Sequence, residues 1–186
     1  MIRKKPALGL DPKAEAGFPT TSCPNESKAA FVQLDLSAIA TARLDTLATA
    51  TLAVDTPGEG FFEITQEAIR FLAKIKAGDG VLLLFIRHTS ASLVIQENAD
   101  PDVRTDLVTA LRRLAPADAS WVHDTEGPDD MPAHVKSMLN GVALHVPVIA
   151  GKIALGTWQG IYVAEHRARP HRREVVLQFV GSCAGN

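Results

Sequence analysis

From about residue 46 onward, most of the chain consists of short apolar runs separated by glycine-containing or polar turn signals. Several of these runs follow one another through connections of only a few residues. Parallel strands need longer crossover connections, so this spacing predicts a mostly antiparallel sheet. Gly151 is placed as a hairpin turn requires. The predicted strands are 47–54, 81–86, 92–95, 142–149, 152–155, 159–164 and 174–180.

About three helices are predicted between these strands. Thr65 can cap a helix that ends at about Lys76, before Gly78-Asp79-Gly80 turns the chain. Asp100 is a favourable N-cap, Pro101 suits the first helical position, and apolar residues then recur at helical spacing until Pro116. A short third helix covers 132–141. Strands with interspersed helices predict a compact α+β domain at 46–186.

Residues 1–45 differ from the rest of the chain. Pro6, Pro12, Pro19 and Pro24 fall within the first 27 residues and leave no usable periodicity. We therefore expect an N-terminal extension that is partly flexible.

Composition and charge argue against some classes of binding partner. A net charge of −2 over 186 residues gives no reason to expect nucleic acid or an acidic membrane. We interpret the basic run 166–173 as a solvated loop, or at most a local anion patch. No apolar run approaches the roughly 20 residues that cross a bilayer. Cys23 and Cys183 share no motif, which fits a reducing compartment, so we expect a cytoplasmic protein.

Two candidate segments flank the strand at 92–95. Arg87, His88 and Ser90 follow a buried strand, where an imidazole could point into a pocket and hydroxyl groups could bind phosphate. Glu97 precedes a helix N-terminus and could orient the His88 ring. A structural histidine and a polar turn remain the alternatives.

The segment 123–134 contains four carboxylates and two histidines, His123 and His134. His134 falls in the first turn of a helix, where the positive helix end favours the neutral imidazole. A neutral imidazole can serve as a base or a metal ligand. The spacing matches no zinc signature, and a solvated acidic loop remains the alternative.

A fourth segment has two glycines on either side of Trp158 and Gln159. Trp158 could stack on a planar ligand while Gln159 bonds its edge, or Trp158 could belong to the core. Glu165 and His166 end the following strand and could reach the same pocket.

Read as a set, the segments 88–92, 97–104, 126–134 and 155–162 resemble the YjbQ family, also called the secondary thiamine-phosphate synthase family. The phrase Glu-Gly-Pro-Asp-Asp-Met-Pro-Ala-His at 126–134 is specific. The resemblance spans about 52–180.

This resemblance implies a compact α+β fold, a homotrimer and a polar cleft close to a subunit boundary. His145 falls outside the implied site, and His166 matches only part of the family. The residues that match recurrent family positions are His88, His123, His134, Glu97, Trp158, Gln159 and Glu165.

The implied activity is weak thiamine-phosphate synthesis with no settled physiological role, in which hydroxymethylpyrimidine pyrophosphate condenses with thiazole phosphate. Such chemistry needs charge stabilisation, which Arg87, Arg104 or a divalent zinc or magnesium ion could supply. We therefore expect a small phosphorylated or heterocyclic ligand. His88, His123, His134 and Glu97 would be catalytic, and the three histidines could instead hold the metal. A metal- or ligand-binding protein without turnover is the alternative.

Overall fold

The computed structural model describes residues 38–183, so most of the predicted extension at 1–45 lies outside the described residues. The helices are α1 (Thr65–Lys74), α2 (Pro101–Leu114) and α3 (Asp130–Asn140). The strands are β1 (Thr46–Thr56), β2 (Gly60–Glu63), β3 (Ala77–Ile86), β4 (Ala91–Glu97), β5 (Ala143–Ile149), β6 (Lys152–Ile153), β7 (Gln159–Glu165) and β8 (His171–Cys183).

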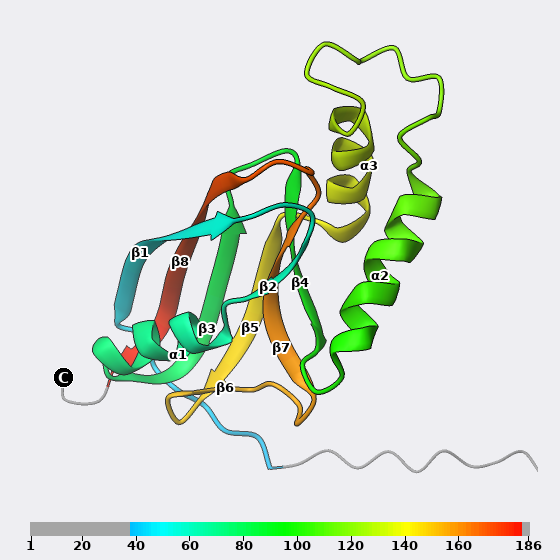
Figure 1. The fold of residues 1–186 in the computed structure, drawn as a ribbon. Helices are drawn as coiled ribbons and strands as arrows, with labels where there is room; N and C mark the ends of the chain where they lie inside the picture. Colours follow the sequence, from blue (N-terminus) through cyan, green and yellow to red (C-terminus); the bar gives the residue numbers. More distant parts are fainter. Residues whose placement is uncertain (1–37, 184–186) are drawn as a thin grey trace, which may run out of the picture. The chain divides into compact units, whose positions relative to one another are not determined.

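Two antiparallel sheets form the domain (Figure 1). The larger sheet has the order β1-β8-β3-β5-β6, and the smaller has the order β2-β7-β4. Every pairing within them is antiparallel. The predicted α+β class with mostly antiparallel strands and three helices is therefore confirmed.

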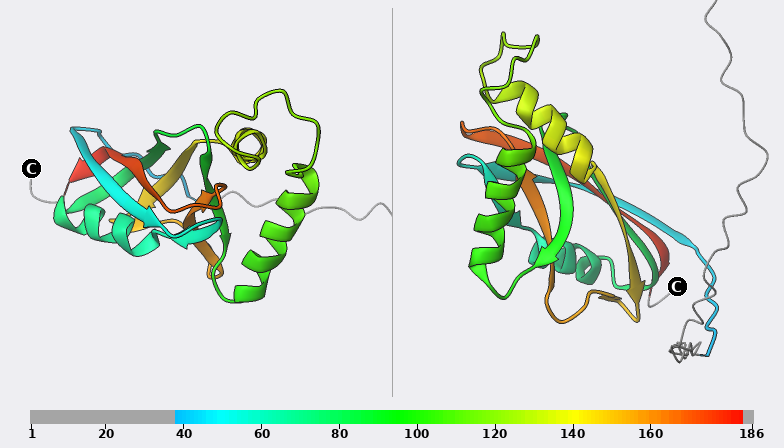
Figure 2. Two further views of the ribbon diagram at one scale, coloured as in Figure 1. Left: turned by 45° about the horizontal axis from the view of Figure 1, so that its top comes forward. Right: turned by 90° about the vertical axis from the view of Figure 1, so that its right-hand side faces the viewer.

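The core lies between the inner faces of the two sheets and α1 (Figure 2). Leu82, Leu84 and Ile86 alternate along β3 with side chains on the opposite face, and all three are buried. Ala68 and Leu72 of α1 pack against the same cluster. Because side chains alternate across a strand, β3 contributes to the core with every second residue.

Two details of the strands differ from the prediction. Gly78 and Gly80 do not form a turn, because they lie inside β3. This strand contains an irregularity in its pairing with β8 between Ala77 and Gly80. A Cβ at Gly80 would collide with the Val180 carbonyl oxygen, so glycine is required by the close approach of β8. Strand β2 was not predicted, because four residues give too short a pattern.

The hairpin at Gly151 is confirmed. Gly151 has a φ of 76°, and Val148 pairs with Ile153 across the turn.

Helix α2 begins as predicted, because the Asp100 side chain accepts a hydrogen bond from the Asp102 N–H at 2.8 Å. No residue of α2 is buried, however. Figure 1 shows the helix standing to one side, beside β2 and α3. No helix in the part of the chain described here is long and apolar enough to cross a membrane.

The alternation along β3 gives a direct test. Leu84→Ala should lower the free energy of unfolding by about 2–5 kcal/mol, because it leaves a cavity in the core. Val81→Ala, on the half-exposed face of the same strand, should cost far less. Urea denaturation of both variants measures the difference, and equal losses would contradict the assignment of the two faces.

Candidate functional site

Three ligand-type side chains meet at the N-terminal end of α3. Asp130 and His134 lie four residues apart and therefore share one face of the helix. His123 reaches them from the loop between α2 and α3. His123 Nε2 lies 2.8 Å from Asp130 Oδ2, and His134 Nε2 lies 3.5 Å from the same oxygen. One ligand atom from each residue lies within 4.8 Å of the others, so the cluster could hold a metal ion.

The orientation of His134 follows from a backbone contact. Its Nδ1 lies 3.0 Å from the Thr89 carbonyl oxygen, which can only accept a hydrogen bond. Nδ1 must therefore carry the proton. In the neutral ring, Nε2 then presents a lone pair toward the Asp130 carboxylate.

Arg167 holds the acidic side of this cluster in place. Its guanidinium bonds Asp130 Oδ1 through Nη1, Asp129 Oδ2 through Nε at 3.2 Å and the Glu126 carbonyl oxygen at 2.8 Å. Burial opposes ionisation of Asp129, but hydrogen bonds from the Ala168 N–H and Arg167 outweigh it and lower the Asp129 pKa. Arg167, which follows β7, therefore holds residues 126–130 against the end of that strand.

His88 and His134 line one hollow of about 410 Å³, together with Met138 and Val142. The His88 Nε2 accepts a hydrogen bond from the Glu174 N–H at 2.9 Å. Burial, followed by the charge of Arg173, lowers the His88 pKa. His88 is thus a neutral ring in the wall of this hollow, and it is not part of the His123–Asp130–His134 cluster.

Glu165 is buried in the interior, and both of its carboxylate oxygens accept hydrogen bonds from other residues of the chain. Burial raises its pKa, but the hydrogen bonds outweigh burial and the net pKa is lowered. Arg173, which pairs with it, also donates to Ser90 Oγ at 3.2 Å. Glu165 and Ser90 therefore organise the ends of the strands. The five donors to Glu165 are Thr56 Oγ1, Arg173 Nε, Arg173 Nη2, His166 N and Arg167 N.

Glu97, Trp158 and Gln159 lie at the opposite end of the smaller sheet. Glu97 pairs with Gln159, whereas Glu165 pairs with the first residue of β4. Six residues of strand separate the two ends, a distance of about 20 Å. Trp158 is 65% exposed, and Gln159 Oε1 accepts the Gly156 N–H in a tight turn. Within a single chain, Glu97, Trp158 and Gln159 therefore do not lie near His88, His123 or His134.

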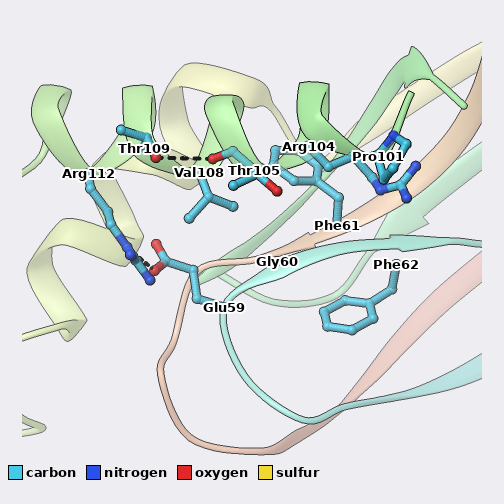
Figure 3. Close-up of a pocket in the computed structure, with 10 residues that line it drawn as sticks. All are labelled: Glu59, Gly60, Phe61, Phe62, Pro101, Arg104, Thr105, Val108, Thr109 and Arg112. Carbon is cyan, nitrogen blue, oxygen red and sulfur yellow. Dashed lines mark hydrogen bonds and ion pairs between the residues drawn. The ribbon is translucent and has the colours of Figure 1, made fainter. Parts of the chain in front are cut away.

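The predicted charged groups outside these clusters have other partners. Arg87 is exposed and pairs with Glu174 at 3.2 Å. Arg104 lies over the ring of Tyr162, 5.9 Å from its centroid. Arg104 lines a groove between α2 and β2, drawn in Figure 3. The groove has a volume of about 520 Å³, and none of the three histidines lines it.

Sequence reasoning missed Asp130 and Arg167 as members of the site. Asp130 precedes His134 by one helical turn, a spacing that could have indicated it. Arg167 belongs to the run 166–173, whose interpretation as a solvated loop is wrong. Arg167 and Arg173 are buried in carboxylate pairs, and the run enters β8 at His171.

Comparison with known proteins supports this fold. The family described as "UPF0047 protein YjbQ-like" matches residues 50–182. The chain belongs to the YjbQ family. Its relatives include UPF0047 protein sll1880 of Synechocystis, 44% identical over 70% of the chain and 89% of the relative. UPF0047 protein YjbQ of Escherichia coli O157:H7 is 41% identical over 70% of the chain and 96% of the relative.

Solved structures agree with the YjbQ assignment. Conserved hypothetical protein TT1486 from Thermus thermophilus has a TM-score of 0.61 and 39% identity, covering 68% of this chain and 97% of that one. Hypothetical protein APE1520 from Aeropyrum pernix has a TM-score of 0.68 and 26% identity, covering 73% and 99%. The YjbQ fold thus extends across bacterial and archaeal relatives.

His166 of this YjbQ domain makes stability depend on pH. Burial, followed by the charge of Lys136, lowers its pKa to about 4. Between that value and the unfolded pKa of about 6.5, only the unfolded state binds the proton. Acidification from pH 7.5 to 5 should therefore lower the free energy of unfolding, with roughly 2 kcal/mol from His166.

Urea denaturation at the two pH values measures this loss. His166→Gln should reduce it, whereas His145→Gln, an exposed histidine on β5, should not. An identical loss in wild type and His166→Gln would contradict the assignment.

Proposed function

We propose that this YjbQ domain is a small-molecule enzyme centred on a divalent-metal site formed by His123, Asp130 and His134. One observation carries the proposal. When the ring is neutral, the His134 Nε2 lone pair faces Asp130 Oδ2 at 3.5 Å, because Nδ1 donates its hydrogen to the Thr89 carbonyl oxygen. Two acceptors facing each other are stable when a cation lies between them.

The residues present fit zinc. Two imidazole nitrogens and one carboxylate oxygen form a common catalytic zinc set, with a fourth position for water or substrate. Ligands at about 2.0–2.1 Å in a tetrahedron are roughly 3.3 Å apart, between the 2.8 and 3.5 Å seen here. Magnesium prefers oxygen ligands and fits this set less well. The Thr89 carbonyl and Arg167 act as the outer partners that orient metal ligands.

The hollow that His88 and His134 share provides the substrate side of the proposed site. Met138 and Val142 give it an apolar wall that suits the ring of a heterocyclic substrate. A bound zinc ion would act as a Lewis acid toward a phosphoryl oxygen. The condensation of hydroxymethylpyrimidine pyrophosphate with thiazole phosphate is the specific reaction that we propose to assay.

A homotrimer is part of the same proposal, and the outer face of the larger sheet supports it. Leu47, Val180 and Val81 are neighbours across three strands in one row of this face. All three are exposed, as are Phe85 and Ile149 on the same sheet. A contiguous exposed apolar patch is typical of a protein interface. Trp158 and Gln159, far from the histidines of their own chain, could reach a neighbour's site only through such an assembly.

Zinc binding is the first test. Wild-type protein should bind one zinc ion per chain in competition with a chromogenic chelator. Asp130→Asn and His134→Ala should lower zinc affinity by more than about 100-fold, because loss of an outer-shell partner already costs 10–100-fold. His145→Ala, which removes an exposed histidine outside the cluster, should bind as wild type does. Equal affinity in all four proteins would refute the metal site.

Turnover separates an enzyme from the competing function, metal binding without catalysis. His88 Nε2 accepts a hydrogen bond from the Glu174 N–H, so this nitrogen is not free to act as a base. This contact favours metal binding without catalysis. Zinc-loaded protein should convert the thiamine precursors or a member of a phosphate-ester panel, and His134→Ala should abolish the conversion with little change in melting temperature. Stoichiometric zinc without turnover on the whole panel would establish the binding function instead.

The oligomeric state tests the apolar face. Phe85→Glu should convert a trimer into smaller species in light scattering coupled to size exclusion, because a carboxylate would be buried at the interface. Ile69→Glu on α1 is a matched control, since Ile69 and Phe85 are both 42% exposed. A wild-type protein with the mass of one chain would contradict the proposal.

A further inference from the structure

A second, more enclosed hollow of about 260 Å³ lies on the other side of α3. It is lined by Pro132 and Lys136 of α3 and by Asp129, the N-cap of that helix. The hollow described above is instead lined by His134 and Ser137 of α3. Its remaining walls include residues 115–117 after α2. The hollow is therefore separate from the proposed metal and substrate site.

Lys136 brings unused hydrogen-bond donors to this hollow. Its side chain is only 5% exposed, and Nζ lies 2.6 Å from Glu59 Oε1. No other partner of Nζ occurs among residues 38–183. An ammonium group has three N–H bonds, so two remain for a ligand.

His166 supplies a further donor. Ser92 Oγ lies 2.8 Å from His166 Nε2 and also accepts from the Asn140 amide at 3.3 Å. Ser92 is fully buried, and its hydroxyl hydrogen has no other acceptor in the described part of the chain than Nε2. Nε2 therefore accepts, and Nδ1 of the neutral ring carries the proton.

The Nδ1 of His166 faces accessible space. It has no hydrogen-bond partner among the described residues, yet none of their sealed side-chain nitrogens or oxygens lacks a partner. Nδ1 is therefore not fully sealed, although His166 is only 2% exposed, and His166 lines the hollow. Its N–H can donate to a ligand there.

Three of the four carboxylate oxygens of Glu59 and Asp129, which line the hollow, already accept hydrogen bonds. Glu59 accepts from Lys136 through Oε1 and from Arg112 Nε through Oε2 at 2.7 Å. Asp129 Oδ2 accepts from Arg167 and from the Ala168 N–H. The free N–H groups of Lys136 and His166 therefore outnumber the one carboxylate oxygen left without a donor, and the exposed guanidinium of Arg112 adds further N–H groups.

We propose that this hollow binds a small oxyanion, a phosphate or a short-chain carboxylate, through Lys136 Nζ, His166 Nδ1 and Arg112. An anion accepts the free N–H groups that the lining carboxylates leave unpaired. The volume lies below the 300–1,000 Å³ of ordinary small-molecule pockets, which favours a small occupant. This site shares no ligand atom with the His123–Asp130–His134 cluster and does not rest on the proposed function.

Isothermal titration with inorganic phosphate and, separately, acetate at constant ionic strength tests the proposal and distinguishes the two anions. Wild-type protein should bind at least one of them saturably at one per chain. Lys136→Met should weaken binding by about tenfold or more, because a charged donor is lost. Arg112→Gln should weaken it by a smaller factor. Arg113→Gln, its neighbour on α2 that does not line the hollow, should leave binding unchanged.

A second variant tests the proposal even if the Lys136→Met protein fails to fold. Ala117→Trp, at an exposed position in the wall, should block the mouth and abolish binding while the fold is retained. His134→Ala should still bind the anion, which separates this site from the metal cluster. No saturable binding of either anion to wild type, or wild-type affinity in Ala117→Trp, would overturn the proposal.

Discussion

The Glu165–Arg173 pair is the interaction on which the arrangement of the site depends. It is sealed between the consecutive strands β7 and β8, and two residues distant in sequence, Thr56 of β1 and Ser90 before β4, bond to it. A buried pair is not by itself a strong source of net stability, since desolvation opposes its attraction. Its effect here is geometric. Glu165 also accepts the backbone N–H groups of the two following residues, so it sets the direction in which the chain leaves β7.

That direction gives two neighbouring side chains different partners. His166 turns toward Ser92 and Lys136, whereas Arg167 turns toward the carboxylates of Asp129 and Asp130. The same backbone turn thus supports both the proposed oxyanion hollow and the proposed metal cluster. The two sites remain chemically separate because the first presents donors and the second presents acceptors.

The sequence was most informative where local chemistry alone determines structure. The Asp100 cap, the Pro101 start and the turn at Gly151 were predictable because each depends on a few adjacent residues. The roles of Arg167 and Arg173 were not, because their carboxylate partners on α3 and β7 cannot be read from a local charge run. His123 and His134 do meet in space, as the shared segment 123–134 indicated. Glu97 and Trp158 lie at the far end of a strand pair, a separation that only the strand register reveals.

The weak attachment of α2 has a consequence for access to the cluster. No residue of that helix is buried, so we expect local opening of α2 to require less free energy than opening of the sheets. The loop that follows it carries His123, whereas Asp130 and His134 are anchored on α3 through Arg167 and the Thr89 carbonyl. Local opening would therefore withdraw one ligand and leave two in position. A metal ion at the proposed site would then exchange through loss of the His123 contact alone, with the fold of the two sheets retained.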